Sequence, residues 1–257
     1  IAFGITTNGS TLSEEIIEYL SANFKYNLSI SLDGDEQTQT INRIPITTVP
    51  TYSSILESAI QLQDKSGIVR ARMTFEPDNV PSLFSNIQFL IEKGFKYICI
   101  SPNTFRNDWS DSDFQAIFEE LRKVKHYIGK NGLTDIKLND INNTFTELSR
   151  CSACESYYNF DVDGSIYPCT FLVGDRQFLV GNVATGLLPE KIKLIDTIKN
   201  AEVFECSDCQ LSPYCQSTRC IFANYVTTGD SFKPNLVKCN MINIKNNLIG
   251  DYDAKLR

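Results

Sequence analysis

Eight of the nine cysteines in this 257-residue chain lie in its second half, at spacings that could bind metal. In order, they are Cys151, Cys154, Cys169, Cys206, Cys209, Cys215, Cys220 and Cys239. Four thiolates complete the shell of a tetrahedral zinc ion or of a four-iron cluster. A C-x-x-C pair lets two sulfurs reach one metal from a single tight turn, and the chain has two such pairs. The spacing therefore predicts two four-thiolate centres, and it leaves zinc and iron–sulfur as alternatives.

Disulfide bonds and buried free thiols are the alternative uses of these cysteines. Eight thiols could form four disulfides, but a chain of this length can build a core without such crosslinks. Cys99 lies alone in the apolar run 97–100 and is expected to be a buried thiol. Metal binding by the other eight is therefore favoured over disulfides.

The composition narrows the partners and the kinds of catalysis. A net charge of −7 disfavours nucleic acid and anionic membranes as main partners. No apolar run approaches the ~20 residues that a membrane-spanning helix needs. The single histidine, His126, falls in a charged helical stretch and is expected at the surface, so histidine-based catalysis is disfavoured. We expect a cytoplasmic protein with neither nucleic acid nor membrane as a partner.

The residues before the cysteines alternate short apolar strands with amphipathic helices, and this order positions the candidate sites. Strands are expected to end near residues 7, 32, 75 and 100, and a helix follows each of them. The polar stretch 34–50 is expected to be an irregular loop with a function. Four such units predict a parallel α/β sheet or barrel. The polar residues at the strand ends would then face one mouth; they are Asn8, Asp33, Glu76 and Asn103.

A β-hairpin is expected inside the cysteine region. Residues alternate in polarity on both sides of Asp163-Gly164, a pair that favours a type I′ turn. This hairpin would position Cys169, which follows it in the chain, to bind a metal.

The cysteine spacing resembles the SPASM region of radical S-adenosylmethionine (SAM) enzymes, which binds two auxiliary four-iron clusters. That pattern is C-x(9–15)-G-x4-C, then C-x2-C-x5-C-x3-C, then a last C. The matching residues here are Cys154, Gly164 and Cys169, then Cys206, Cys209 and Cys215, then Cys239. Four residues, rather than three, separate Cys215 from Cys220, which is a departure from the pattern.

The resemblance also implies which cysteines share a cluster. The cluster nearer the barrel would be held by Cys151, Cys154, Cys169 and Cys220. The outer cluster would be held by Cys206, Cys209, Cys215 and Cys239. Because these two sets interleave in sequence, they would tie the end of the chain to its middle.

The first half resembles the partial barrel of the same enzymes. Thr-Asn-Gly at 7–9 and Ser-Leu-Asp-Gly at 31–34 look like its third and fourth strand ends, although spacing alone favours simple turns. The resemblance implies that the cofactor-binding residues are Asn8, Ser31, Asp33 and Arg43. Ser31 would contact the SAM ribose, and Arg43 would bind the SAM carboxylate through two parallel hydrogen bonds. Arg70 and Arg72 are the alternatives to Arg43.

The motif that holds the SAM-cleaving cluster in this family, C-x3-C-x2-C, does not occur in the chain. With four βα units where the family has six, we expect the C-terminal part of a longer enzyme. Residues 1–147 would be the last four units of a partial (β/α)6 barrel, and residues 148–257 would be the SPASM domain. The chain by itself should not cleave SAM, and no catalytic residue is assigned. Its first strand would be an open sheet edge, which favours association or poor solubility.

Thr170 narrows the activity within the family. Anaerobic sulfatase-maturating enzymes carry an aspartate base directly after the cysteine that matches Cys169, and a threonine hydroxyl cannot act as a base near neutral pH. The run 167–175 instead resembles maturases that form thioether crosslinks in ribosomal peptides. The resemblance therefore implies an oxidoreductase-like peptide maturase with two auxiliary 4Fe-4S clusters and SAM as cofactors. A third 4Fe-4S cluster would be held by a preceding part of the enzyme.

The expected partners are a cysteine-containing peptide and an electron donor such as flavodoxin or ferredoxin. Within the class, the alternatives are peptide oxidation, as in sulfatase maturation, and carbon–carbon crosslinking. From another class, the alternative is a non-enzymatic zinc-binding interaction module with two four-cysteine sites.

Overall fold

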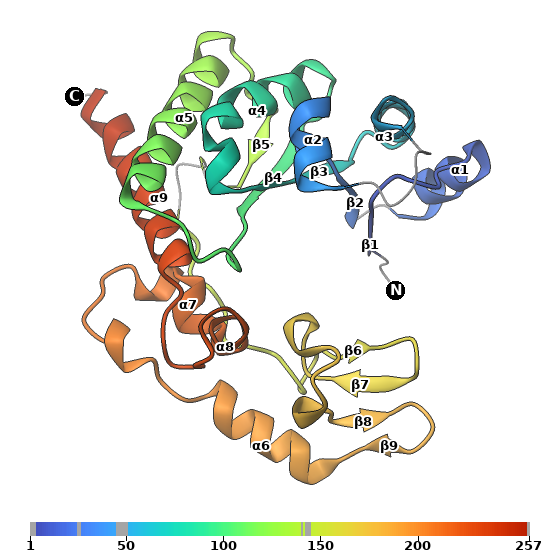
Figure 1. The fold of residues 1–257 in the computed structure, drawn as a ribbon, viewed down its shortest axis with the longest axis vertical. Coiled ribbons are helices and arrows are strands. Elements are labelled where there is room, and N and C mark those ends of the chain that lie inside the picture. The colour runs from blue at the N-terminus through green and yellow to red at the C-terminus, as the bar shows by residue number, and fades with distance from the viewer. Residues whose placement is uncertain (1–3, 25–26, 45–50, 140, 142–144, 256–257) are drawn as a thin grey trace. The chain divides into compact units, whose positions relative to one another are not determined.

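The computed structural model describes residues 4–24, 27–44, 51–139, 141 and 145–255, and these form two compact units (Figure 1). The first unit contains the residues up to 144 together with those from 244 onward, and the second contains 145–243. The C-terminal residues thus pack with the sheet-bearing half of the chain. The functional division at residue 147 stays a prediction.

A parallel five-stranded sheet forms the centre of the first unit, which confirms the predicted α/β fold class. The strands are β1 (Gly4–Thr7), β2 (Asn27–Ser31), β3 (Arg70–Phe75), β4 (Tyr97–Pro102) and β5 (Lys137–Leu138), paired in that order. All four pairings are parallel. The sequence did not predict β5, because a strand of two residues shows no alternation. Strand β1 lies at the edge of the sheet, as expected.

Helices follow the strands. They are α1 (Glu14–Asn23), α2 (Glu36–Asn42), α3 (Tyr52–Ser66), the 3-10 helix η1 (Pro77–Ser82), α4 (Leu83–Glu92) and α5 (Asp111–Lys130). The expectation that 34–50 is irregular was wrong for its first part, since Asp35 caps α2 by accepting a hydrogen bond from the Thr38 N–H. Residues 45–50 of that stretch lie outside the described residues. No helix in the described part of the chain is long and apolar enough to cross a membrane.

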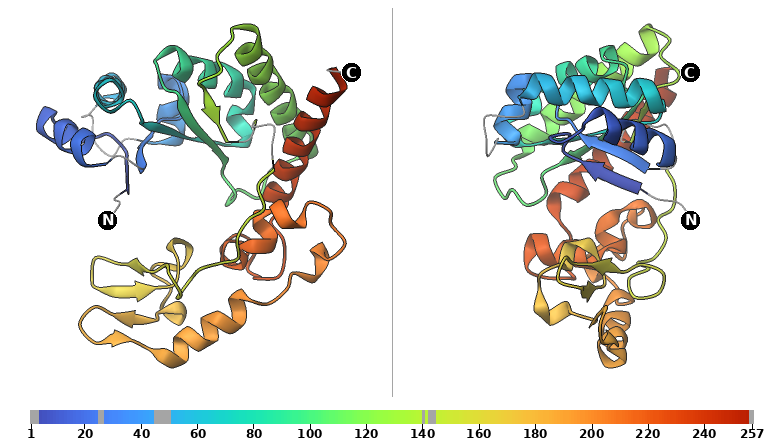
Figure 2. Two further views of the ribbon diagram at one scale, coloured as in Figure 1. Left: turned by 180° about the vertical axis from the view of Figure 1, so that it is seen from behind. Right: turned by 90° about the vertical axis from the view of Figure 1, so that its right-hand side faces the viewer.

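The two faces of the sheet differ in polarity. Figures 1 and 2 show α3, α4 and α5 on one side of the strands. Strand alternation places Ala71, Met73 and Phe75 of β3 on one face of the sheet, and all three are buried. The other face carries a row of polar residues, because Ser31, Arg72 and Cys99 are direct neighbours across β2, β3 and β4. The predicted burial of Cys99 was wrong. Its side chain is only partly buried, since strand alternation places it opposite the buried isoleucines on either side.

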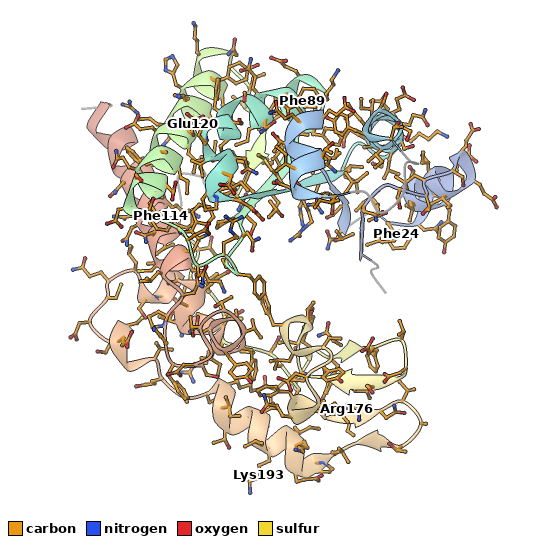
Figure 3. All side chains as sticks on the ribbon, in the orientation of Figure 1. Phe24, Phe89, Phe114, Glu120, Arg176 and Lys193 are labelled. Atoms are coloured by element: carbon orange, nitrogen blue, oxygen red, sulfur yellow. The ribbon has the colours of Figure 1, made fainter. Side chains whose placement is uncertain are left out.

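A buried carboxylate links α4 and α5. Glu120 of α5, labelled in Figure 3, is 7% exposed and accepts a hydrogen bond of 3.1 Å from the Phe84 N–H. Phe84 lies in the first turn of α4, whose N-cap Ser82 makes no side-chain capping bond. A carboxylate near a helix N-terminus satisfies an unpaired N–H and interacts favourably with the helix dipole. Glu120 therefore replaces the missing cap from a neighbouring helix.

The second unit contains a four-stranded antiparallel sheet and short helices. The strands are β6 (Asn159–Phe160), β7 (Ser165–Tyr167), β8 (Gly181–Asn182) and β9 (Gly186–Leu187). The α-helices are α6 (Pro189–Lys199), α7 (Gln216–Arg219), α8 (Ile221–Thr228) and α9 (Leu236–Lys255), of which α9 continues into the first unit. The 3-10 helices are η2 (Thr170–Leu172), η3 (Arg176–Phe178), η4 (Phe204–Cys206) and η5 (Ser212–Tyr214).

The predicted hairpin is present, but its turn type was wrong. The loop spans residues 161–164, with the Gly164 N–H bonded to the Asp161 carbonyl and the Asp161 N–H bonded to the Ser165 carbonyl. Gly164 has φ +84°, whereas Asp163 is not among the residues with positive φ. A type I′ turn requires positive φ at both central residues. The loop is therefore a longer connection that ends on a left-handed glycine.

The glycine that follows Asp33 is required by a close contact. Gly34 has φ +126°, and a Cβ atom there would lie 2.1 Å from Asn86 Oδ1. Asn86 cannot move freely, because Oδ1 accepts from the Asp35 N–H and Nδ2 donates to Thr38 Oγ1. We expect Gly34→Ala to lower the free energy of unfolding by about 3 kcal/mol.

Urea unfolding followed by the fluorescence of Trp109, the chain's single tryptophan, measures this loss in the first unit. Gly67→Ala is the matched control. Gly67 has φ +71° but open space around its Cβ position, so only backbone strain of about 1 kcal/mol is expected. Equal losses in the two variants would contradict the role given to Asn86.

Candidate functional site

The eight cysteines come from different elements of the second unit. Cys151 and Cys154 precede β6, and Cys154 has φ +62°, a left-handed conformation unusual for a residue with a side chain. Cys169 precedes η2, Cys206 ends η4, and Cys215 precedes α7. The remaining three are Cys209, Cys220 before α8 and Cys239 on α9.

Electrostatic proximity divides the thiols into two groups. In the first group, Cys151 interacts with Cys220 and Cys154, and Cys169 interacts with Cys220 and Cys151. In the second group, Cys206 interacts with Cys215, Cys209 and Cys239. The first group is thus Cys151, Cys154, Cys169 and Cys220, and the second is Cys206, Cys209, Cys215 and Cys239. These are the same sets that the resemblance implies; their role as ligands stays a prediction.

In both groups, several thiols are in surroundings that disfavour the thiolate unless a cation is bound beside it. Burial raises the pKa of Cys169 to about 12 and that of Cys154 to about 11, because a buried thiolate loses its hydration. In the second group, burial and the neighbouring thiols raise the pKa of Cys206 and of Cys239. A bound metal centre reverses these effects, because it neutralises the thiolates that ligate it. The residues present therefore fit a metal centre in each group.

A cavity of about 310 Å³ is lined by Cys151 of the first group and Cys206 of the second. Among the described residues, no three Cys, His, Asp or Glu side chains are arranged to hold one ion. Zinc and iron–sulfur stay the alternatives for each group, because both accept four thiolates.

A buried lysine, which the sequence did not single out, fixes the first C-x-x-C turn. The side chain of Lys199 is 1% exposed, and its Nζ donates to the Ala153 carbonyl at 2.9 Å. It also pairs with Glu155 at 2.7 Å and with Asp196 at 2.9 Å. Lys199 therefore anchors the backbone between Cys151 and Cys154. Lysine on an amphipathic helix gives no sequence signal for such a contact, because most lysines there are solvated.

Thr170, directly after Cys169, lies in a neutral hydrogen-bond chain. Its hydroxyl donates to Asn159 Oδ1 at 2.9 Å and lies 3.1 Å from the Tyr157 hydroxyl. Because the Thr170 proton points to Asn159, Tyr157 is the donor to Thr170. No carboxylate takes part in this chain of contacts.

At the carboxyl end of β2, the structure pairs two of the residues predicted to bind SAM. Asp33 is 0% exposed and accepts from Arg43 Nε at 2.8 Å and Nη2 at 2.9 Å. It also accepts from the Thr74 N–H of β3 at 2.8 Å. Both parallel donors of Arg43 are thus directed to Asp33, and the binding of SAM by Arg43 stays a prediction. Its alternative Arg72 is exposed and lies directly opposite Ser31 in the sheet.

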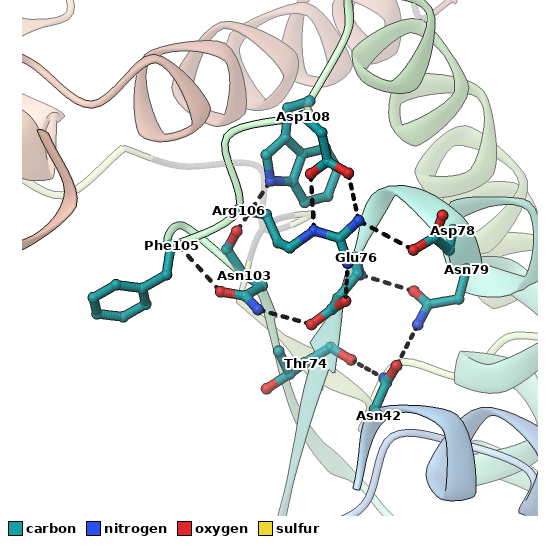
Figure 4. Close-up of polar contacts among 10 residues, drawn as sticks. Asn42, Thr74, Glu76, Asp78, Asn79, Asn103, Phe105, Arg106 and Asp108 are labelled. Carbon is teal, nitrogen blue, oxygen red and sulfur yellow. Dashed lines mark hydrogen bonds and ion pairs between the residues drawn. The ribbon is translucent and has the colours of Figure 1, made fainter. Parts of the chain in front are cut away.

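Polar contacts connect the ends of β3 and β4, as Figure 4 shows. Arg106 Nη1 donates to Glu76 at 2.7 Å, and Asn103 Nδ2 donates to the other oxygen of Glu76 at 2.7 Å. Arg106 also pairs with Asp108, which raises the pKa of Arg106 and lowers that of Asp108. The predicted strand-end residues Glu76 and Asn103 therefore meet directly.

Asn8 behaves differently from the other predicted strand-end residues. Its Oδ1 accepts from the N–H of Ser10 at 3.0 Å and from the Ser10 hydroxyl at 2.8 Å. These are contacts within a turn, so the structure shows the turn that spacing alone favoured.

The fold and the thiol groups together define an α/β unit joined to a cysteine-rich unit.

No protein-family model matches the sequence. The cysteine-type anaerobic sulfatase-maturating enzyme of Clostridium perfringens (strain 13 / Type A) is 24% identical over 237 residues, covering 82% of this chain and 62% of the relative. The enzyme of the same name from Clostridium novyi (strain NT) is 20% identical over 240 residues, covering 84% of this chain and 63% of that relative. The chain thus spans less than two thirds of the length of these relatives.

Solved structures share the fold at low sequence identity. Native anSMEcpe with bound AdoMet and Kp18Cys peptide superimposes with a TM-score of 0.77 at 16% identity, over 99% of this chain and 75% of that chain. Streptococcus suis SuiB bound to precursor peptide SuiA superimposes with a TM-score of 0.61 at 16% identity, over 92% of this chain and 58% of the SuiB chain. The fold is therefore that of the sulfatase-maturating and SuiB-type radical SAM enzymes, and the resemblance drawn from the cysteines is confirmed at this level.

Proposed function

We propose that this chain supplies the auxiliary-cluster region and part of the SAM-binding barrel of a radical SAM enzyme that forms thioether crosslinks in a cysteine-containing ribosomal peptide. The observation that carries the proposal is the division of eight thiols into two groups of four, on a fold shared with peptide-modifying radical SAM enzymes. Each group would hold one 4Fe-4S cluster. When bound, the clusters supply or accept electrons, which amino-acid side chains alone cannot do.

The cofactors and partners follow from the same comparison. Solved relatives contain AdoMet, and some also contain a peptide. We propose SAM for the polar sheet face, where Ser31 and Arg72 adjoin, and a peptide substrate beside the first thiol group. The SAM-cleaving cluster requires a C-x3-C-x2-C motif that this sequence does not contain, and an electron donor would reduce that cluster.

Thioether formation is favoured over sulfatase maturation by the residue after Cys169. Thr170 and its neighbours Tyr157 and Asn159 are neutral groups, so this position offers no carboxylate base. Sulfatase maturation is the second candidate, because the curated relatives carry that name at 20–24% identity.

Co-expression of candidate precursor peptides with this chain and a segment that carries the C-x3-C-x2-C motif tests the proposal. Thioether formation should lower the peptide mass by two hydrogens and leave one cysteine that no longer reacts with an alkylating reagent. The same mass loss with all thiols still reactive would indicate a carbon–carbon crosslink. An oxidised side chain without a crosslink would support sulfatase-type maturation. Stoichiometric zinc in protein purified without oxygen would contradict all three of these peptide modifications and would support a zinc-binding module.

A further inference from the structure

The loop between β4 and α5 exposes a large apolar side chain, Phe105. This residue is 63% exposed. Figure 4 shows its ring directed away from the polar contacts that join the ends of β3 and β4. In parallel α/β sheets and barrels, ligands bind at the carboxyl ends of the strands. Phe105 is therefore exposed at the edge of the sheet where a substrate is expected.

Hydrogen bonds on both sides of Phe105 hold its loop in place. Asn103 Oδ1 accepts from the Phe105 N–H at 3.1 Å, and the Asn103 carbonyl accepts from the Arg106 N–H at 3.3 Å, which closes a turn around Phe105. The same carbonyl accepts from Trp109 Nε1 at 3.0 Å, and the Trp109 ring stacks on Phe114. A loop that is already ordered loses little conformational entropy when it binds a ligand. The loop therefore presents Phe105 in a position suited to contact with a ligand.

The polar network beside Phe105 carries an excess of negative charge. Its one guanidinium, that of Arg106, pairs with the carboxylates of three residues, which are Glu76, Asp78 and Asp108. Two of the three negative charges are thus not offset within this network. The side chains of Asp78 and Asp108 are 72% and 50% exposed, so a cationic ligand can reach them from solvent. This edge of the sheet suits a ligand that combines an apolar group with a positive charge.

We propose that Phe105 is a specificity-determining residue that contacts an apolar side chain of the peptide substrate, and that this peptide carries a lysine or arginine close to the apolar residue. The aromatic ring removes water from an apolar side chain, which stabilises the complex, whereas a serine gains little from the same contact. The carboxylates of Asp78 and Asp108 attract a basic residue and repel an acidic one. This inference rests on the proposed function and deepens it, because it names the kind of peptide that the enzyme accepts.

The test measures peptide binding by the full 257-residue chain and requires no catalysis. Three fluorescein-labelled synthetic peptides, each with one cysteine, are compared by fluorescence anisotropy. The cysteine is flanked by leucine and lysine in the first peptide, by serine and lysine in the second, and by leucine and glutamate in the third. We expect the first peptide to bind about tenfold more tightly than either of the others.

Variants assign these preferences to the residues named. Phe105→Ser should bind the leucine–lysine and serine–lysine peptides equally, and Phe105→Leu, which keeps an apolar side chain, should retain most of the preference for leucine. Asp78→Asn should reduce the preference for lysine about threefold and leave the preference for leucine unchanged. Tyr19→Ser is the matched control, because Tyr19 is 61% exposed but lies on α1 rather than at a strand end.

The outcomes separate this inference from the proposed function. An unchanged preference for leucine in Phe105→Ser would overturn the role of Phe105, and so would an equal loss of that preference in Tyr19→Ser. A parent chain that binds none of the three peptides would also overturn it. Failure of the proposed function has a different result, in which the peptides bind with the expected preferences but co-expression yields no modified peptide.

Discussion

Anaerobic reconstitution of a Cys239→Ala variant is expected to yield about four irons per chain, against about eight in the parent chain. Cys239 interacts electrostatically with Cys215 and Cys209, and it also acts on Cys206. Removing it leaves the second group with three thiols, while the first group keeps all four. Iron and sulfide analysis, with the visible absorption of the reconstituted protein, measures the loss.

Cys99→Ala is the control for this loss. Cys99 lies on β4 in the first unit and belongs to neither thiol group, so its removal should leave the iron content unchanged. The proposed division would be wrong if Cys239→Ala kept about eight irons, or if it lost all of them. A parent chain with about four irons would show that only one group binds a cluster.

Replacing Asp33 with alanine is expected to cost about 3 kcal/mol of the free energy of unfolding of the first unit. The variant removes the partner of both Arg43 donors and of the Thr74 N–H, and Asp33 itself is fully buried. Removal of one member of a buried ion pair leaves the other without its counter-charge. Arg43 is one-third exposed, so water can replace part of the lost interaction. Urea unfolding followed by Trp109 fluorescence provides the measurement, because Trp109 packs on Phe75 and Phe114 within this unit.

An exposed ion pair provides the matched control. Glu18 and Lys65 lie 3.2 Å apart with both side chains well exposed, and Glu18→Ala should cost less than about 1 kcal/mol. The loss in the free energy of unfolding for Asp33→Asn should fall between those of Asp33→Ala and Glu18→Ala. This variant keeps an acceptor for the Thr74 N–H but loses the charge. An Asp33→Ala loss no greater than that of Glu18→Ala would show that Asp33 does not organise the end of β2.

Several elements of the first unit could be predicted because their signals are local. Strand β3 alternates buried residues with less buried ones along its whole length, and the spacing of apolar residues marks α5. Helix α1 begins at Glu14, and its N-cap is Ser13, whose hydroxyl accepts a hydrogen bond from the Ile16 N–H. Helix α2 was missed because its residues are polar and its buried side chains, Thr38 and Gln39, make hydrogen bonds.

The sequence by itself determined the fold class and the number of thiols available for metal, because periodicity and cysteine spacing are properties of short stretches of chain. Tertiary structure alone decided that Arg43 is directed to Asp33 and that Lys199 holds the first C-x-x-C turn. These contacts arise when separate helices and strands pack together. Charged residues at the surface and charged residues in such contacts look alike in sequence, because only burial and the position of the partner distinguish them.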